Sequence, residues 1–242
     1  MTLEILLLAT MVVSAILAAI HSLAVRGRRD TLWLVVTGVS FGYLFPFIDI
    51  NLFGHYTFHG QLTVLNFPLH LGFSWFALYY MSFCLGEYLV GHLQKRWLVA
   101  LVSGLVFGLL EAQWDPTLLH LGIMELFLPS FGDYPWNFNP GIPFCHAYFG
   151  FAWVYAYLVF RDTPRFGLAL ALGTATLVLW PLGVMVWVPV LEPVYLGSKA
   201  SFGPAVRVTL DVVHLGLSFI VTGIVGAWFL RFLAKRLARA AA

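Results

Sequence analysis

Seven separate runs of apolar residues constrain this chain more than any other feature. Each is long enough to form a helix of about 20 residues, which crosses roughly 30 Å of hydrocarbon at about 1.5 Å per residue. The runs are 3–25, 31–50, 64–91, 97–115, 141–160, 166–190 and 208–233. No basic region precedes the first run, which therefore predicts a retained helix and not a cleaved signal peptide.

The composition agrees with a membrane protein. Hydrophobic residues make up 61% of the 242 residues and charged residues only 10%, whereas soluble domains carry about 25% charged residues. The net charge of +2 is too small to indicate a nucleic-acid partner. The two cysteines provide neither a disulfide framework nor a thiolate metal site. We predict an all-α polytopic membrane protein, a single domain over residues 1–242 folded as a seven-transmembrane-helix bundle.

Basic residues are divided unequally between the two ends of the predicted helices. Eleven lie on one side, and only Lys199 and Arg207 lie on the other. Because Lys and Arg are enriched in cytoplasmic loops, this asymmetry predicts an outside N-terminus and a cytoplasmic C-terminus. The connections 51–63 and 116–140 then lie on the outer side, where we expect them to cap a cavity. An aromatic belt in the membrane interface is the alternative for 116–140.

The fourth run carries ionisable residues where hydrocarbon is expected. Its small and acidic residues, at steps of four, three and four, are Gly104, Gly108, Glu111 and Asp115. This spacing places them on one face of a helix. A charge in hydrocarbon costs several kcal/mol, so such residues indicate a functional site facing the bundle. The glycines would allow a neighbouring helix or a ligand to come close.

Polar residues also mark the outer ends of the second, third and seventh runs. They are Asp49 at the end of the second run with His55 soon after it, Asn66 and His70 with Trp75 at the start of the third, and Asp211 and His214 in the seventh. Together with the fourth run they predict a cavity with a polar outer end and aromatic walls.

Each of these residues also has a structural interpretation. Asp49 and Asp115 would cost little if they were solvated at the interface. Glu111 would serve as a buried hydrogen-bond partner of His70, His214 or Gln113, and Asp211 with His214 would form an ion pair that joins two helices.

Several chemistries do not match the sequence. Repeated histidine boxes of the membrane di-iron type, a lysine in the last run for a retinal Schiff base, and a Gly-rich phosphate loop are all missing. A metal site built from Glu111, Asp115, Asp211 and His214 would be compatible with a helical bundle. The repeated Glu-x-x-His pairs of such sites are missing. We therefore expect no metal and no other cofactor.

The outer-side motifs resemble the membrane-integral carotenoid biosynthesis protein family, which includes bacterial carotenoid 1,2-hydratases and archaeal hydratases of C50 carotenoids. The matching residues are DINLFGHYTF at 49–58, NFPL at 66–69, GFSWFA at 72–77, WDP at 114–116, LG at 121–122 and GIP at 141–143. The chain departs from the family at three places. Asp49 replaces Glu, Phe58 replaces Tyr, and Cys145 and His146 stand where the family has Asn. These differences concern substrate identity more than reaction class.

The resemblance implies a hydratase that adds water to the terminal trisubstituted double bond of an acyclic isoprenoid. Such an alkene reacts only after protonation, and a carboxyl group in apolar surroundings retains a proton for this purpose. Asp115 and Glu111 are the first candidates for the acid, since repulsion between neighbouring carboxylates keeps a proton on the pair. Aromatic rings would stabilise the cation; the candidates are Tyr56, Trp75, Trp114 and Trp136.

The other polar residues would handle the water. Asp49, Asp211 and His214 would orient or deprotonate it, and Asn66, His70 and His55 would position water or substrate. The substrate would enter from the bilayer of a prokaryotic cytoplasmic membrane. The same residues would also serve a protonation-initiated terpene or carotenoid cyclase or isomerase. A third alternative is a carotenoid- or lipid-binding protein or an accessory membrane subunit without catalytic activity.

Overall fold

Helices account for most of the described chain. The computed structural model describes residues 3–54, 56–59, 62–64, 67–126, 141–163, 166–175, 177 and 203–239. The long helices are α1 (Leu3–Arg26), α2 (Arg28–Ile48), α3 (Leu71–Val90), α4 (Arg96–His120), α5 (Gly141–Phe160) and α7 (Pro204–Arg239). Asp49–Phe53 continues α2 as a π-helix and Gly91–Leu93 follows α3 as a 3₁₀ turn. The expectation of a mostly helical chain is confirmed.

Three of these helices are long and apolar enough to cross a membrane. They are Ile5–Arg26, Arg28–Phe53 and Arg96–His120. The predicted sixth run begins with a shorter apolar helix, Phe166–Ala175. Residues 178–190 of that run lie outside the described residues.

Two predicted boundaries differ from the structure. The run 64–91 does not begin as a helix, because Thr63–Val64 (β2) pairs with Phe67–Pro68 (β3) in a short antiparallel hairpin. A proline lacks a backbone N–H and disfavours helix at the residue before it, so α3 begins only at Leu71. The fourth run continues as helix through Pro116 to His120. The first part of the expected 116–140 loop is therefore helical, and residues 127–140 lie outside the described residues.

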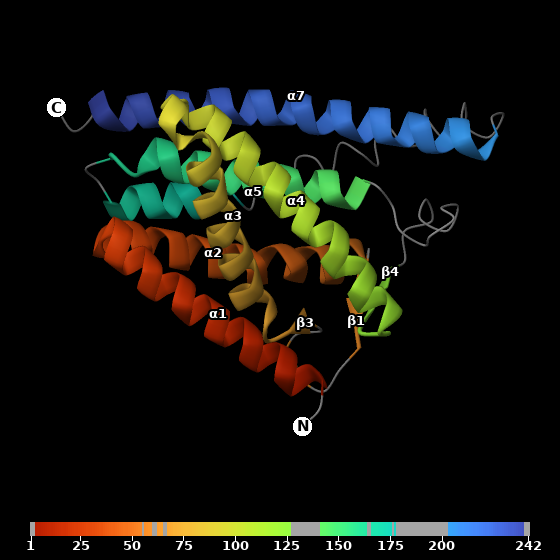
Figure 1. Cartoon of the computed structure of the whole chain (residues 1–242). Helices are drawn as coiled ribbons and strands as arrows, with labels where there is room; N and C mark the ends of the chain where they lie inside the picture. The colour runs from red at the N-terminus through yellow and green to blue at the C-terminus, as the bar shows by residue number, and fades with distance from the viewer. Residues whose placement is uncertain are drawn as a thin grey trace.

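A second pair of strands joins two connections at one end of the bundle. Tyr56–Phe58 (β1) follows the π-helix, and Met124–Leu126 (β4) follows α4. The strands are antiparallel, with Tyr56 opposite Leu126 and Phe58 opposite Met124. Both lie at the end of the bundle opposite the C-terminus (Figure 1). The prediction of an all-α fold is therefore incomplete, because the described residues also form four short strands.

Glycines allow two pairs of helices to pack with their backbones in close contact. On α4, a Cβ at Gly104 would overlap the carbonyl oxygen of Ala147 on α5, and a Cβ at Gly108 would lie 2.5 Å from the carbonyl oxygen of Pro143. On α2, a Cβ at Gly42 would lie 2.7 Å from the Cβ of Trp75 on α3. The predicted inward face of α4 is confirmed, and α5 is the neighbour that its glycines admit.

Basic side chains at the other end of the bundle bind protein groups. Arg26 forms an ion pair with Glu87, and its guanidinium lies 4.2 Å from the centre of the Phe83 ring. Arg96 donates to the carbonyl oxygen of Leu158 at 2.8 Å, near the end of α5. Arg26 and Arg96 belong to the eleven basic residues that the sequence predicts on the cytoplasmic side. Both therefore join helices, whether or not they also set the orientation in the membrane.

We predict that Gly108→Ala lowers the stability of the protein. Alanine normally favours a helix over glycine by about 1 kcal/mol, but here the added methyl meets Pro143 and, at 2.9 Å, the Cβ of Ala147. Overpacking of this kind costs about 1–3 kcal/mol, so the unfolding midpoint in detergent should fall by several degrees. The control is Gly216→Ala on α7, where no atom lies within 4 Å of the added Cβ. Equal midpoints for the two variants would contradict the close contact.

Candidate functional site

Glu111, Asp115 and His146 form one cluster between α4 and α5. The carboxylate and imidazole atoms of the three side chains all lie within 4.8 Å of one another. The Nδ1 atom of His146 lies 4.0 Å from Oδ2 of Asp115. Glu111 is only 4% exposed, and the side chains of Asp115 and His146 are 14% and 13% exposed. The cluster is thus largely shielded from solvent.

The local sequence explains how the three side chains meet. Glu111 and Asp115 are four residues apart on α4, so their side chains lie one turn apart on the same face. On α5, Ala147 packs on the two glycines of that face. His146 is its neighbour in the chain and therefore lies close to the next turn of α4. The contact of α5 with the glycines of α4 thus places the His146 imidazole beside Glu111 and Asp115.

No basic side chain neutralises the two carboxyl groups. In the part of the chain that the structure describes, no Lys or Arg interacts with Glu111 or Asp115, which interact with each other and, for Asp115, with His146. Two buried carboxylates this close repel one another strongly, so the pair favours binding a proton. A divalent cation would serve the same purpose, since carboxylate and imidazole are suitable ligands. A bound cation would displace the proton, so one site cannot do both at once.

Aromatic rings enclose the imidazole of His146. Its ring centre lies 5.4 Å from that of Trp75 on α3, 5.8 Å from Phe107 on α4 and 6.0 Å from Phe149 on α5. All three aromatic side chains are buried. Ring faces attract cations, so the wall beside the carboxyl pair is suited to a positive charge that forms there for a short time.

Asp49 and Tyr56 approach the cluster from the C-terminal end of α2. Asp49 opens the π-helix, is 3% exposed, and does not face bulk solvent. Burial raises the pKa of the Tyr56 hydroxyl, and the carboxylates of Asp49 and Asp115 raise it further. Tyr56 therefore remains protonated near neutral pH and lies close to both acids. Asp49 and Asp115 also interact electrostatically with Cys145, next to His146. Three of the four predicted acids thus meet in one region.

Tyr79 adds a hydroxyl group that the sequence reasoning missed. It lies on α3 one turn after Trp75, is 1% exposed, and its ring centre lies 4.5 Å from that of Phe107. Its hydroxyl interacts electrostatically with Glu111 and Cys145. Within the described residues, this hydroxyl has no hydrogen-bond partner. A buried polar atom of this kind is costly unless it binds water or a ligand.

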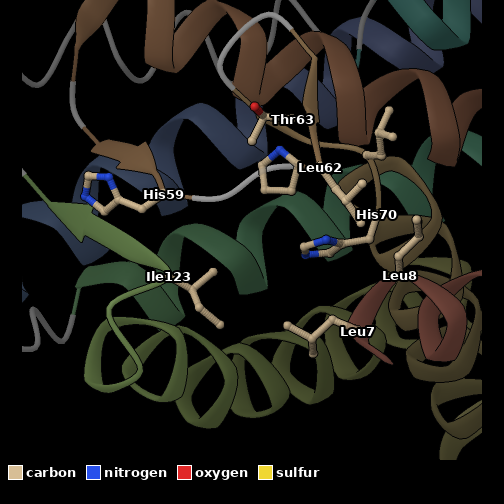
Figure 2. A pocket seen from close by; sticks show the side chains of 9 residues that line it. Leu7, Leu8, His59, Leu62, Thr63, His70 and Ile123 are labelled. Atoms are coloured by element: carbon tan, nitrogen blue, oxygen red, sulfur yellow. The ribbon is translucent and has the colours of Figure 1, made fainter. Parts of the chain in front are cut away.

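His70 lies in a separate small hollow. The hollow has a volume of about 20 Å³, enough for one water molecule. Its walls include Leu7, His59 and Ile123, and no residue of the acidic cluster. Figure 2 shows the His70 imidazole directed into this hollow. The prediction that Glu111 pairs with His70 therefore differs from the structure, in which Asp115 and His146 are its neighbours.

The remaining predicted residues do not join the described cluster. Trp114 is half-buried against the core, and Gln113, another suggested partner of Glu111, is exposed. His55, Asn66 and Trp136 lie outside the described residues. Asp211 and His214 lie on α7. Their side chains are not among those that the structure describes, so their predicted ion pair stays a prediction.

His146 is the most important residue that the sequence reasoning missed. The sequence shows it beside Cys145, at a place where the chain departs from the resembled family. Helix α5 is aromatic along most of its length, so no polar stripe marks the face that carries His146. The useful signal was the glycine spacing on α4, which requires a close neighbour. That spacing does not say which helix supplies it.

Comparison with family models, curated proteins and solved structures finds no match for this chain.

We predict that Glu111→Gln leaves the fold intact and does not lower the unfolding midpoint. The amide keeps the shape of the side chain, donates a hydrogen bond to Asp115, and removes the repulsion between two buried carboxyl groups. Residues kept for function often reduce stability in this way. A matched control is Asp162→Asn, which removes a largely exposed ion pair with Arg96 worth at most about 1 kcal/mol. A midpoint for Glu111→Gln well below both wild type and this control would indicate a structural role for the pair.

Proposed function

We propose that this protein is an integral membrane hydratase that adds water to the terminal trisubstituted double bond of an acyclic isoprenoid, with a carotenoid as the leading substrate class. The observation that carries this proposal is the Glu111–Asp115 pair, two buried carboxyl groups without a basic partner among the described residues. The aromatic wall formed by Trp75, Phe107 and Phe149 supports it. The resemblance of the outer-side motifs agrees with this chemistry.

The carboxyl pair would supply the proton that starts the reaction. A protonated carboxyl group of Glu111 or Asp115 gives its proton to the CH carbon of the double bond, which leaves a positive charge on the tertiary carbon. The carboxylate that remains and the nearby ring faces stabilise that charge. Water then adds to the tertiary carbon, and its released proton restores the pair. No redox step is needed, which agrees with the expectation of no cofactor.

We also propose that the chain crosses a prokaryotic cytoplasmic membrane seven times, with the N-terminus outside. The candidate spans and the eleven basic residues on one side support this arrangement. Glu111 and Asp115 lie in the last third of Arg96–His120, toward the end of the bundle that carries β1 and β4 (Figure 1). The site would therefore lie in the outer leaflet, where an isoprenoid can enter sideways from lipid.

The proposed topology is tested with reporter fusions. Green fluorescent protein fluoresces in the cytoplasm, whereas alkaline phosphatase is active outside it. We expect fluorescence from a fusion at the C-terminus and phosphatase activity from an insertion after Gly54, which lies in the predicted outer connection 51–63. Phosphatase activity at the C-terminus would contradict the orientation. Termini on the same side of the membrane would contradict seven spans.

The proposed reaction is tested in cells that make an acyclic carotenoid. Expression of the protein should yield a product heavier than the substrate by one water molecule. Glu111→Gln and Asp115→Asn should reduce this product by about 100-fold or more, because general acids commonly contribute that much. The exposed Asp162→Asn should retain full activity.

Other products would favour the alternative functions. An unchanged mass with altered chromatographic retention would indicate cyclisation or isomerisation, which use the same acid and aromatic rings. Retained carotenoid without any conversion, in wild type and variants alike, would indicate a binding protein.

A further inference from the structure

The distance between His146 and the acidic pair matches a water molecule held between them. The 4.0 Å from His146 Nδ1 to Asp115 Oδ2 is too long for a direct hydrogen bond. A water with hydrogen bonds of about 2.8 Å to both atoms spans such a distance with an angle of about 90° at its oxygen. The Glu111 carboxylate lies within 4.8 Å of both side chains, so it faces the same position.

Tyr79 provides independent support for a polar ligand at this place. Its hydroxyl is buried, interacts electrostatically with Glu111, and has no hydrogen-bond partner among the described residues. The rings of Trp75 and Phe107 pack against both Tyr79 and His146. The hydroxyl and the imidazole therefore belong to the same part of the core.

We infer that His146 and Tyr79 hold the water molecule that captures the cation, and that His146 accepts the proton which this water loses. This inference rests on the proposed hydratase function and adds two residues to it. His146 acts as the base, while Tyr79 positions the oxygen of the water.

The proton balance of the reaction is complete with these groups. The carboxyl pair gives one proton to the CH carbon and the π electrons form the new C–H bond. A lone pair of the water forms the C–O bond to the tertiary carbon. The resulting oxonium loses one proton to the imidazole of His146, which passes it to the carboxylate 4.0 Å away through the next water. The enzyme returns to its initial state, and the alkene has gained one water.

The inference predicts that loss of His146 separates protonation from hydration. Without a positioned water, the cation returns its proton to form alkene again. In D₂O the carboxyl pair carries deuterium, so alkene recovered from such cycles contains deuterium at the CH carbon. With purified protein in D₂O-equilibrated vesicles containing an acyclic carotenoid, His146→Gln should reduce the hydrated product about 100-fold. Deuterium should still enter the recovered alkene at a rate near that of wild-type protonation.

Tyr79→Phe should also lower the ratio of hydrated product to deuterated alkene, but less strongly. We expect roughly a tenfold loss of hydration, because this variant removes one hydrogen bond to the water. The exposed residues His120 and Tyr88 supply matched controls, His120→Gln and Tyr88→Phe, which should keep the wild-type ratio. His146→Phe, whose ring suits the aromatic surroundings, serves as a second variant if the glutamine variant does not fold.

Four outcomes decide the matter. Deuterium exchange that persists while hydration falls supports the inference. If His146→Gln lowers deuterium exchange and hydration by the same factor, or lowers neither, the inference is overturned. One divalent metal per chain in the wild-type protein, lost in His146→Gln, also overturns it in favour of a metal ligand. Wild-type protein that neither hydrates the carotenoid nor exchanges deuterium overturns the proposed function, and this inference with it.

Discussion

The close contact between α4 and α5 is the interaction on which the rest of the site depends. Lipid provides little hydrophobic drive for helices to associate, so close packing at small residues becomes decisive. Gly104 and Gly108 let the backbone of α5 come near enough for Ala147 to fill the groove. The turn beyond this contact carries the carboxyl pair, and His146 faces it because of the same contact. A helix with larger residues at these two positions would separate the acid from the imidazole.

Charge is the second constraint. The described residues place no cation beside Glu111 and Asp115, although the chain has arginines that it uses elsewhere to join helices. An arginine at this place would stabilise both carboxylates and remove the acid. The absence of a basic partner among the described residues is what the proposed role of the pair in proton transfer requires. Repulsion between the two carboxyl groups lowers the stability of the protein, and the tight packing of the surrounding aromatic residues offsets this loss.

The sequence predicted the parts of the structure that follow from periodicity. Apolar runs located the helices, and the spacing of Glu111 and Asp115 placed both on one inward face. Features that depend on contacts between distant segments could not be predicted in this way. The pairing of β1 with β4 and the approach of His146 join residues that are far apart in the chain. The π-helix at Asp49 was also missed, because its pattern of residues is too short to show a period.

The pairing of β1 with β4 has a consequence for how the protein can vary. Backbone hydrogen bonds hold Tyr56 beside the end of α4, and His59 N adds another to the carbonyl oxygen of Ile123 at 2.8 Å. Backbone bonds of this kind do not depend on side-chain identity. The ladder therefore tolerates changes of side chain at Thr57, whereas Glu125, which faces it, also binds His59 Nε2 at 2.9 Å. The backbone ladder thus keeps the Tyr56 phenol beside Asp49 and Asp115 without relying on the side chains of the two strands.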